Sequence, residues 1–302
     1  MRTSLHGNTS VALDGSRFMD YVSLTKPELT FLSVLTALAG YLLAAEGRVQ
    51  PWAMATALTG IALVGGGAGA LNQYLERRWD ALMRRTDHRP LPSGRLLPQQ
   101  ALIFGIASSV LGLIDLALLT NITTASLGAA TLVTYLFLYT PLKRLTPWAT
   151  IVGAIPGAIP PVMGWTAAGR SVDLTALFIA AVLFLWQVPH FLSLAWIYRR
   201  DYANAGYRLL STEDESGALT ARECLAFMSA LMLIIGVPCI TGFSGVVYMA
   251  GAFLVTGVFL ATGWVHLIET SNRSARLMFV GSLIYLPTLM GLMVIDRLLL
   301  PA

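Results

Sequence analysis

Three oxygen-bearing side chains recur at four-residue intervals after an apolar, glycine-rich run. Asn72, Glu76 and Asp80 stand at i, i+4 and i+8, so a helix that continues out of the run IALVGGGAGAL places them on one face. An amide and two carboxylates one turn apart form an oxygen-rich patch that suits a hard divalent cation such as Mg²⁺. The spacing therefore predicts a metal site at the end of a membrane-length segment.

Five arginines accompany this patch, at positions 77, 78, 84, 85 and 89. Carboxylates that hold Mg²⁺ beside arginines suit a diphosphate, because the metal bridges phosphate oxygens while guanidinium groups neutralise those that remain. The alternative is an ordinary polar loop that obeys the positive-inside rule. Such a loop does not require Asn, Glu and Asp at four-residue intervals, so we favour the diphosphate site.

The composition is that of a polytopic membrane protein. Of the 302 residues, 56% are hydrophobic and 12% are charged, which excludes a soluble domain. Nine apolar runs are long enough to span a bilayer, at 27–45, 51–75, 98–119, 123–141, 147–168, 173–198, 222–241, 244–268 and 275–298. We expect an all-α fold of nine transmembrane helices, a single domain over 1–302 bundled around a central cavity. Residues 1–20 form a polar N-terminal tail without the apolar stretch of a cleaved signal peptide.

Basic residues gather on one side of these nine runs. That side carries 17 of the 20 lysines and arginines, and only Arg48, Arg170 and Arg297 lie on the other. By the positive-inside rule, the N-terminus and the stretch from Asn72 to Pro92 face the cytoplasm, or the matrix of a mitochondrion. The net charge of +4 then reflects topology and anionic lipid rather than nucleic acid. The two cysteines lack metal-ligand spacing, and we expect them to be packing residues.

A second charged region follows the sixth apolar run, which ends FLWQVPHFLSLAWIYRRDYANAGYRLL. Asp201 and Tyr202 follow this run as Asp80 follows the second, which hints at an internal duplication of four-helix units. Either Asp201 supplies a carboxylate that faces the first cluster across a cavity, or it pairs at the surface with Arg199 or Arg200.

Several further residues in or next to the apolar runs could have a structural or a functional role. Lys143 and Arg144 follow the fourth run on the same side as both acidic regions, and either contact phosphate or serve topology alone. Pro189 should kink or open the sixth run. The imidazole of His190 is either bonded to a neighbouring helix or has an acid/base or iron-contacting role. Asp115, toward the outer end of the third run, should be a structural group that faces the bundle interior.

Small and helix-breaking residues mark the walls of the expected cavity. The fifth run contains Pro156, Pro160 and Pro161 with several glycines, which predicts an irregular helix that walls the site. The glycines at 65–67 and 69 predict close approach of neighbouring helices rather than substrate contact.

A metal-diphosphate site above an apolar cavity suits a prenyl diphosphate, whose charged head stays with metal and arginine while its tail lies among apolar side chains. Breaking the allylic C–O bond leaves diphosphate and a carbocation-like prenyl group. A cavity that excludes water protects this cation until an electron-rich acceptor attacks it. The pattern therefore predicts prenyl transfer rather than hydrolysis.

The chain resembles the UbiA superfamily of membrane prenyltransferases, whose first motif N-x3-D-x3-D is matched by Asn72, Glu76 and Asp80. Within it, the chain looks like the branch that farnesylates haem b. This narrower likeness rests on SLTKPELTFL at 23–32, MRRTDHRPLPSGR at 83–95, YTPLKR at 139–144, GAIPPVMGW at 157–165, WQVPHFLSLAW at 186–196, DYANAGYRLL at 201–210 and SLIYLPTLMGLM at 282–293.

The resemblance implies transfer of a farnesyl group from farnesyl diphosphate to a vinyl group of haem b, with Mg²⁺ as cofactor. The product, haem O, would feed haem A synthesis, with haem A synthase as a downstream partner and a bacterial cytoplasmic membrane as the location. Asn72, Glu76, Asp80 and Asp201 would hold metal and diphosphate as the catalytic set. The expected substrate-binding residues are Arg84, Arg85, Thr86, Arg89, Lys143, Arg144, His190, Arg200 and Tyr202.

The chain departs from the superfamily pattern at three positions. Glu76 replaces the commoner Asp, and Arg78 stands where many bacterial relatives have another Asp. The second region has Asp201 alone in place of D-x3-D, which leaves coordination of a second metal open, and Arg200 would compensate by meeting phosphate directly.

Two other functions compete with this one. The acidic motif also fits a UbiA prenyltransferase that acts on a quinone precursor or a chlorin. A secondary transporter with broken helices is a rival of another class. The parallel topology of the two halves and the lack of an acid pair at the bilayer midplane disfavour it.

Overall fold

A computed structural model describes residues 9–299, and these residues form helices and their connections without a β-strand. In chain order the elements are α1 (Thr9–Leu24), α2 (Pro27–Ala45), α3 (Pro51–Asp80), α4 (Pro98–Leu119), α5 (Ile122–Val133), the π-helix η1 (Thr134–Tyr139), α6 (Thr140–Leu142), α7 (Ala149–Ala167), α8 (Leu174–Ile197), α9 (Arg199–Asn204), α10 (Leu210–Glu213), α11 (Ala218–Ile234), α12 (Val237–Ile240), α13 (Val246–Glu269) and α14 (Asn272–Leu299). The prediction of an all-helical fold is confirmed.

The number of spans differs from the prediction of nine. Eight helical segments within residues 9–299 are long and apolar enough to cross a membrane. The run at 147–168 is the exception: it forms α7, a helix of 19 residues whose three internal prolines and three glycines lower its hydropathy. The other eight runs coincide with the observed segments to within a few residues, because long apolar stretches determine helix position strongly.

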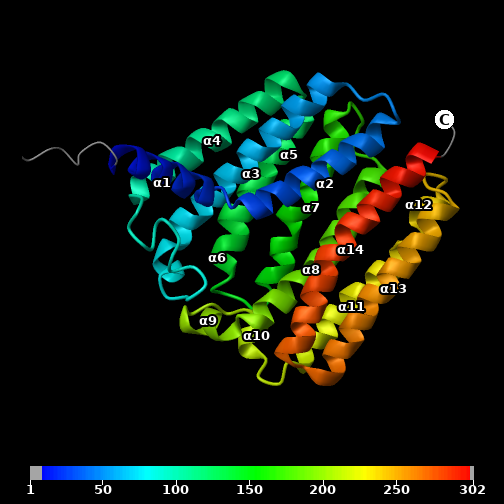
Figure 1. Cartoon of the computed structure of the whole chain (residues 1–302). Helices are drawn as coiled ribbons and strands as arrows, with labels where there is room; N and C mark the ends of the chain where they lie inside the picture. The colour runs from blue at the N-terminus through cyan, green and yellow to red at the C-terminus, as the bar shows by residue number, and fades with distance from the viewer. Residues whose placement is uncertain (1–8, 300–302) are drawn as a thin grey trace, which may run out of the picture.

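The long helices lie side by side in one bundle, with α7 in its interior (Figure 1). Helix α7 packs against α2, α3, α5 and α8, and α14 packs against both α8 and α2. The approach of α7 to α2 is very close: a Cβ on Gly164 would lie 1.8 Å from the carbonyl oxygen of Ala37, and one on Gly40 would lie 2.0 Å from that of Pro161. Glycine at both positions is what lets the two backbones touch.

The basic side of the bundle carries α1, the short helices α9 and α10, and the longest connections. Figure 1 shows α1, the 81–97 connection, α9 and α10 gathered toward one end. The predicted polar tail is helical from Thr9 as α1, and residues 1–8 lie outside the described range. Arg95 donates from Nε to Asp20 Oδ1 at 2.8 Å, so an ion pair fastens the 81–97 connection to α1.

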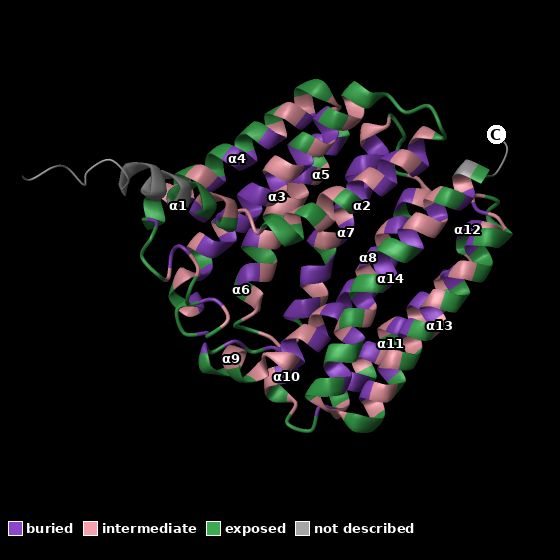
Figure 2. Cartoon of the chain, viewed as in Figure 1, coloured by how far each residue is buried: buried purple, intermediate pink, exposed green. Residues whose placement is uncertain are grey.

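The opposite end of the bundle holds a separate set of charges. The Glu46 carboxylate accepts from Arg170 at 2.5 Å and from Arg297 at 2.7 Å, which joins the α2–α3 and α7–α8 connections to the last turn of α14. Asp296 accepts from the backbone amides of Gly245 at 2.5 Å and Tyr248 at 2.9 Å, and so caps the start of α13. Figure 2 shows exposed residues along the outer surfaces of the bundle and buried ones toward its interior.

The prolines do not end the helices that contain them. Pro189 lies inside α8, and Pro156, Pro160 and Pro161 lie inside α7, and both helices are continuous. The expected kink or local opening at these prolines stays a prediction. The irregular segment is η1, where six residues form a π-helix. This segment contains no proline, and single π turns are frequent at functional sites.

Candidate active site

The last turns of α3 bury three oxygen-bearing side chains. The helix continues to Asp80, as the four-residue spacing predicted. Asn72, Glu76 and Asp80 are 0%, 5% and 1% exposed. Thr86 donates from its hydroxyl to the carbonyl oxygen of Asp80 at 2.8 Å, which satisfies a carbonyl left free at the helix end. We call these three residues the oxygen face.

Each member of the oxygen face meets a different cation. Lys26 Nζ donates to Asn72 Oδ1 at 2.5 Å, at the start of α2. Lys143 Nζ donates to Glu76 Oε1 at 2.9 Å, just after α6. Arg89 Nη1 donates to Asp80 Oδ2 at 2.8 Å, from the 81–97 connection. The structure thus surrounds one helix face with three positive groups from three segments of the chain.

The π-helix η1 aligns a second row of polar groups with this face. Its wide turn lets Thr140 donate to the carbonyl oxygen of Tyr135 at 2.8 Å, five residues back. Asn72 Nδ2 in turn donates to Thr140 Oγ1 at 3.0 Å. The Tyr135 hydroxyl accepts from Lys26 at 3.3 Å, and Lys143 lies 4.5 Å from the ring centroid of Tyr139. Both lysines therefore stand between η1 and α3.

The charges of the two lysines are set by their surroundings. Burial opposes the charge on Lys143, but the Glu76 carboxylate and the hydroxyls of Tyr139 and Tyr135 hold its pKa well above the usual value. Burial, and then the positive charge of Arg89, lower the pKa of Lys26 to about 7. Burial and the nearby Glu76 carboxylate raise the pKa of Tyr207, so this hydroxyl stays protonated as a donor. Of the two lysines that meet the oxygen face, Lys143 is thus the one that stays charged.

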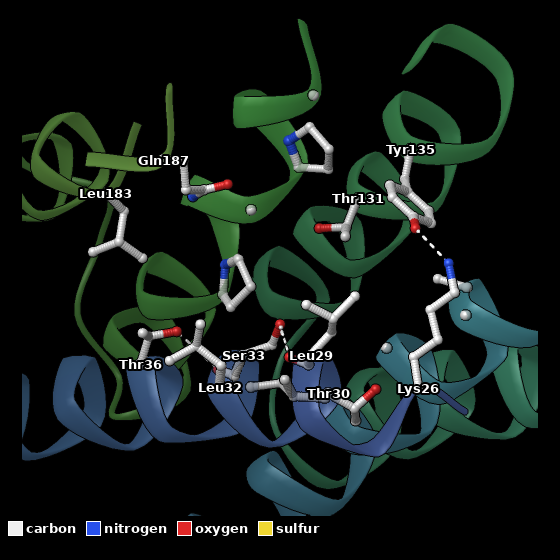
Figure 3. Close-up of a pocket in the computed structure, with 18 of the residues that line it drawn as sticks. Lys26, Leu29, Thr30, Leu32, Ser33, Thr36, Thr131, Tyr135, Leu183 and Gln187 are labelled. Carbon is white, nitrogen blue, oxygen red and sulfur yellow. Dashed lines mark hydrogen bonds between the residues drawn. The ribbon is translucent and has the colours of Figure 1, made fainter. Parts of the chain in front are cut away.

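An apolar cavity extends from Lys26 into the bundle. Its walls come from α2, α3, α5, η1, α7, α8 and α14, and include Tyr135, Pro156, Trp186, His190 and Leu286. Figure 3 shows Lys26 beside Tyr135 at one side of the cavity and Leu183 and Gln187 at the other. The proline-rich fifth run lines this cavity, as expected. The close approach predicted for the glycine run is also present: a Cβ on Gly67 would meet Gly105 and Ser109 of α4, and one on Gly69 would lie 2.9 Å from the carbonyl oxygen of Thr25.

No hydrogen bond or ion pair between described side chains joins Asp201 to the oxygen face. Asp201 is half-buried in α9 and lines a pocket with Tyr198, Arg199, Arg200 and Asn272, and none of these residues lines the cavity that begins at Lys26. The predicted surface pairing is not seen either: within residues 9–299, no ion pair joins Asp201 to Arg199 or Arg200. Arg199 instead donates to Asn272 Oδ1 at 2.7 Å.

The other predicted basic residues differ in burial and in the groups that their side chains contact. Arg85 lies over the rings of Tyr198 and Tyr202 at 5.3 and 5.6 Å, and its Nη2 donates to the Tyr202 hydroxyl at 3.1 Å. Arg144 is exposed over the ring of Trp79 at 4.4 Å. Arg84 and Arg200 are exposed. Arg89 alone among the predicted arginines contacts the oxygen face.

Three polar groups of the spans have structural surroundings. Asp115 Oδ2 is enclosed without a hydrogen-bond partner among the described residues, and a Cβ on Gly60 would lie 2.5 Å from it. His266 is buried, and its Nδ1 lies 2.9 Å from Ser274 Oγ. Cys224 is a buried free thiol, as a packing role predicted. These positions lie outside the cavity lining.

The donor set fits Mg²⁺ by its chemistry. Amide and carboxylate oxygens are the ligands this hard cation prefers. In the structure, Lys143 and Arg89 pair with the carboxylates of Glu76 and Asp80, and Lys26 donates to the amide oxygen of Asn72. Within residues 9–299, no three side chains of His, Cys, Asp or Glu converge as a ready metal cage. Asn72, Glu76 and Asp80 would therefore hold the metal with oxygens of the substrate completing its shell, which is usual for Mg²⁺.

The model of the UbiA prenyltransferase family matches residues 33–284. The chain belongs to this family. A UbiA protein named protoheme IX farnesyltransferase from Solibacter usitatus is 42% identical over 288 residues, covering 92% of this chain and 98% of that one. A protein of the same name from Myxococcus xanthus is 41% identical over 280 residues, covering 92% and 94%.

Solved structures of UbiA proteins share the fold at low identity. A digeranylgeranylglyceryl phosphate synthase matches with a TM-score of 0.79 and 15% identity over 94% of this chain and 100% of that one. The UbiA homologue of Archaeoglobus fulgidus, solved with GPP and Mg²⁺, matches with a TM-score of 0.64 and 13% identity over 91% and 99%. These likenesses establish the UbiA architecture for the chain.

Four residues of this UbiA protein that surround the oxygen face were not predicted as site residues. They are Lys26, Tyr135 and Tyr139, which line the cavity, and Tyr207, which lies beside Glu76. Three of them lay in segments already noted, Lys26 in SLTKPELTFL, Tyr139 in YTPLKR and Tyr207 in DYANAGYRLL. Their contact with the oxygen face depends on the π turn of η1 and on the path of the connection after α9, neither of which has a periodic sequence signal.

Proposed function

We propose that this protein transfers the farnesyl group of farnesyl diphosphate to a vinyl group of haem b and so makes haem O. The observation that carries the proposal is the identity of about 40% over more than 90% of the chain with several proteins named protoheme IX farnesyltransferase. The cavity is consistent with this reaction, because a charged end adjoins a long apolar interior.

In the reaction, the allylic C–O bond of farnesyl diphosphate breaks and diphosphate leaves. The farnesyl C1 forms a carbon–carbon bond with the vinyl group, water adds its hydroxyl to the resulting cation, and one proton is released. Bound Mg²⁺ supplies Lewis-acid stabilisation of the leaving diphosphate. As the substrate binds, Lys26, Lys143 and Arg89 leave their present partners on the oxygen face and donate to phosphate oxygens instead.

The remaining residues orient the substrates and exclude water. Tyr135 and Tyr139 close the charged end against the cavity, and the apolar walls contributed by α2, α7 and α8 surround the farnesyl chain. Asp201 and Arg200 contribute from α9 to the mouth through which diphosphate leaves. By the positive-inside rule this mouth faces the cytoplasm, with the protein in a bacterial inner membrane.

The test is a reconstituted assay with purified protein in nanodiscs, Mg²⁺ and farnesyl diphosphate. Haem b, 4-hydroxybenzoate and a chlorin are offered separately, and products are identified by mass. We expect a farnesylated, hydrated haem from haem b and no product from the other two acceptors. Prenylation of the benzoate or the chlorin alone would refute the proposal, and substrate flux across the membrane without any covalent product would favour a transporter.

A further inference from the structure

The imidazole of His190 belongs to the lining of the cavity. Trp186 and Phe279 stack on it from two sides, each with its ring centroid 4.9 Å away and interplanar angles of 22° and 26°. His190 Nδ1 lies 2.7 Å from Ser282 Oγ. Trp186 Nε1 donates to the Ser282 carbonyl oxygen at 2.8 Å, which fixes α14 against α8 at this point. Both the plane and the rotation of the ring are therefore determined.

The hydroxyl of Ser282 determines the tautomer of this ring. Ser282 Oγ donates its single proton to the carbonyl oxygen of Phe279 at 2.5 Å. It must then accept from His190, so the imidazole proton lies on Nδ1. His190 Nε2 makes no hydrogen bond to the described residues, and these residues do not enclose it completely. The residue itself lines the cavity. A bare nitrogen lone pair thus opens onto the cavity.

The surroundings favour a metal-binding role over a base. A base that takes up a proton becomes an imidazolium, which needs a counter-charge when it is buried. Within residues 9–299, the recorded side-chain partners of the His190 ring are Ser282, Trp186, Phe191 and Phe279, and none carries a charge. A neutral imidazole with a hydrogen-bonded Nδ1–H is the form that ligates haem iron.

We propose that Ser282 is a positioning residue that presents His190 Nε2 as an axial ligand to the iron of the haem acceptor. This inference rests on the proposed function, because it requires an acceptor that contains a metal. The ligand anchors the macrocycle at the deep end of the cavity, and the charged end at Lys26 holds the diphosphate. The two contacts then determine which part of the porphyrin edge meets the farnesyl C1.

The direct test is resonance Raman spectroscopy of the wild-type protein loaded with ferrous haem b. Protein that carries ¹⁵N-labelled histidine is compared with unlabelled protein. We expect an iron–histidine stretching band that shifts on labelling, and its absence would overturn the inference without the need for any variant. His190→Gly should lose the band, and added imidazole should restore it.

Ser282 is tested by variants at one position. Ser282→Ala removes the hydroxyl that accepts from Nδ1, and Ser282→Thr keeps it. We expect Ser282→Ala to weaken haem binding about 10-fold or more and to shift the iron–histidine band, since loss of such an outer hydrogen bond typically has that effect. Ser282→Thr should restore both readouts. Thr288→Ala is the matched control, because Thr288 is an exposed hydroxyl of the same helix. An unchanged band in Ser282→Ala would refute its positioning role.

The inference and the proposed function fail in different ways. If haem O forms but the iron–histidine band is absent, the ligand assignment is wrong and the reaction stands. If the band is present but haem b gives no farnesylated product, the proposed farnesyl transfer is wrong. The assignment of His190 as an iron ligand then still stands, in a protein that binds haem.

Discussion

The two ends of the cavity differ in the charge of the side chains around them. At the end formed by α3, three buried oxygen-bearing side chains each meet a positive group from another segment. At the end formed by α8 and α14, the imidazole of His190 has only neutral neighbours among the described residues. Under the proposed function, the charged groups would hold the diphosphate, and the uncharged surroundings of His190 would receive the macrocycle. A single cavity thereby keeps a carbocation-like group away from groups that would quench it.

The charged end should be far more sensitive to substitution than any other part of the chain. Asp80→Ala removes a carboxylate of the oxygen face and leaves Arg89 without its partner. We expect the rate of farnesyl transfer to fall at least about 100-fold, comparable to the loss of one electrostatic stabiliser, with the protein still folded in the membrane. Product formation and protein level are measured together. Glu215→Ala, an exposed carboxylate elsewhere, should behave as wild type, and retained turnover in Asp80→Ala would remove the oxygen face from the mechanism.

The same end should also show coupling between its charges. Lys143→Met leaves the Glu76 carboxylate buried without its cation, and breaking a buried pair in this way costs about 3–5 kcal/mol of folding free energy. The double variant Glu76→Gln/Lys143→Met should recover most of that stability and stay inactive. Thermal unfolding in detergent measures the first effect and the transfer assay the second. Equal stability of the single and double variants would mean that the pair is solvated.

The sequence predicted the charged end better than the neutral one. A four-residue period places Asn72, Glu76 and Asp80 on one face of any helix, so the oxygen face followed from spacing alone. The cations that meet it come from three segments of the chain, and their register depends on the π turn of η1, which has no periodic signature. His190 was identified as a polar residue at membrane depth, but its tautomer depends on Ser282, 92 positions away. The count of nine spans failed at α7, where the residues that let helices approach closely also lower hydropathy.

The close contact between α2 and α7 should be important for the stability of the fold. In Gly164→Ala, the added Cβ meets the Ala37 carbonyl oxygen at 1.8 Å, and a backbone atom cannot move aside. We expect a loss of about 3 kcal/mol, at the upper end for overpacked interiors, read as a lower unfolding temperature. Gly257→Ala is the matched control, since a Cβ there has no neighbour within 4 Å. It should be neutral or slightly stabilising, and equal effects of the two variants would show that α2 and α7 are not in tight contact.

Asp201 should have the smallest effect of the four positions, because among residues 9–299 it forms no ion pair with the cations that meet the oxygen face, unlike Glu76 and Asp80. If its carboxylate helps to capture or release diphosphate at the mouth, Asp201→Asn should raise the KM for farnesyl diphosphate about 10-fold and leave kcat nearly unchanged, since an interaction made equally in the ground and transition states affects binding alone. Steady-state kinetics at several Mg²⁺ concentrations separate the two parameters. A fall in kcat as large as that of Asp80→Ala would show that α9 closes onto the oxygen face during turnover and joins the charged end.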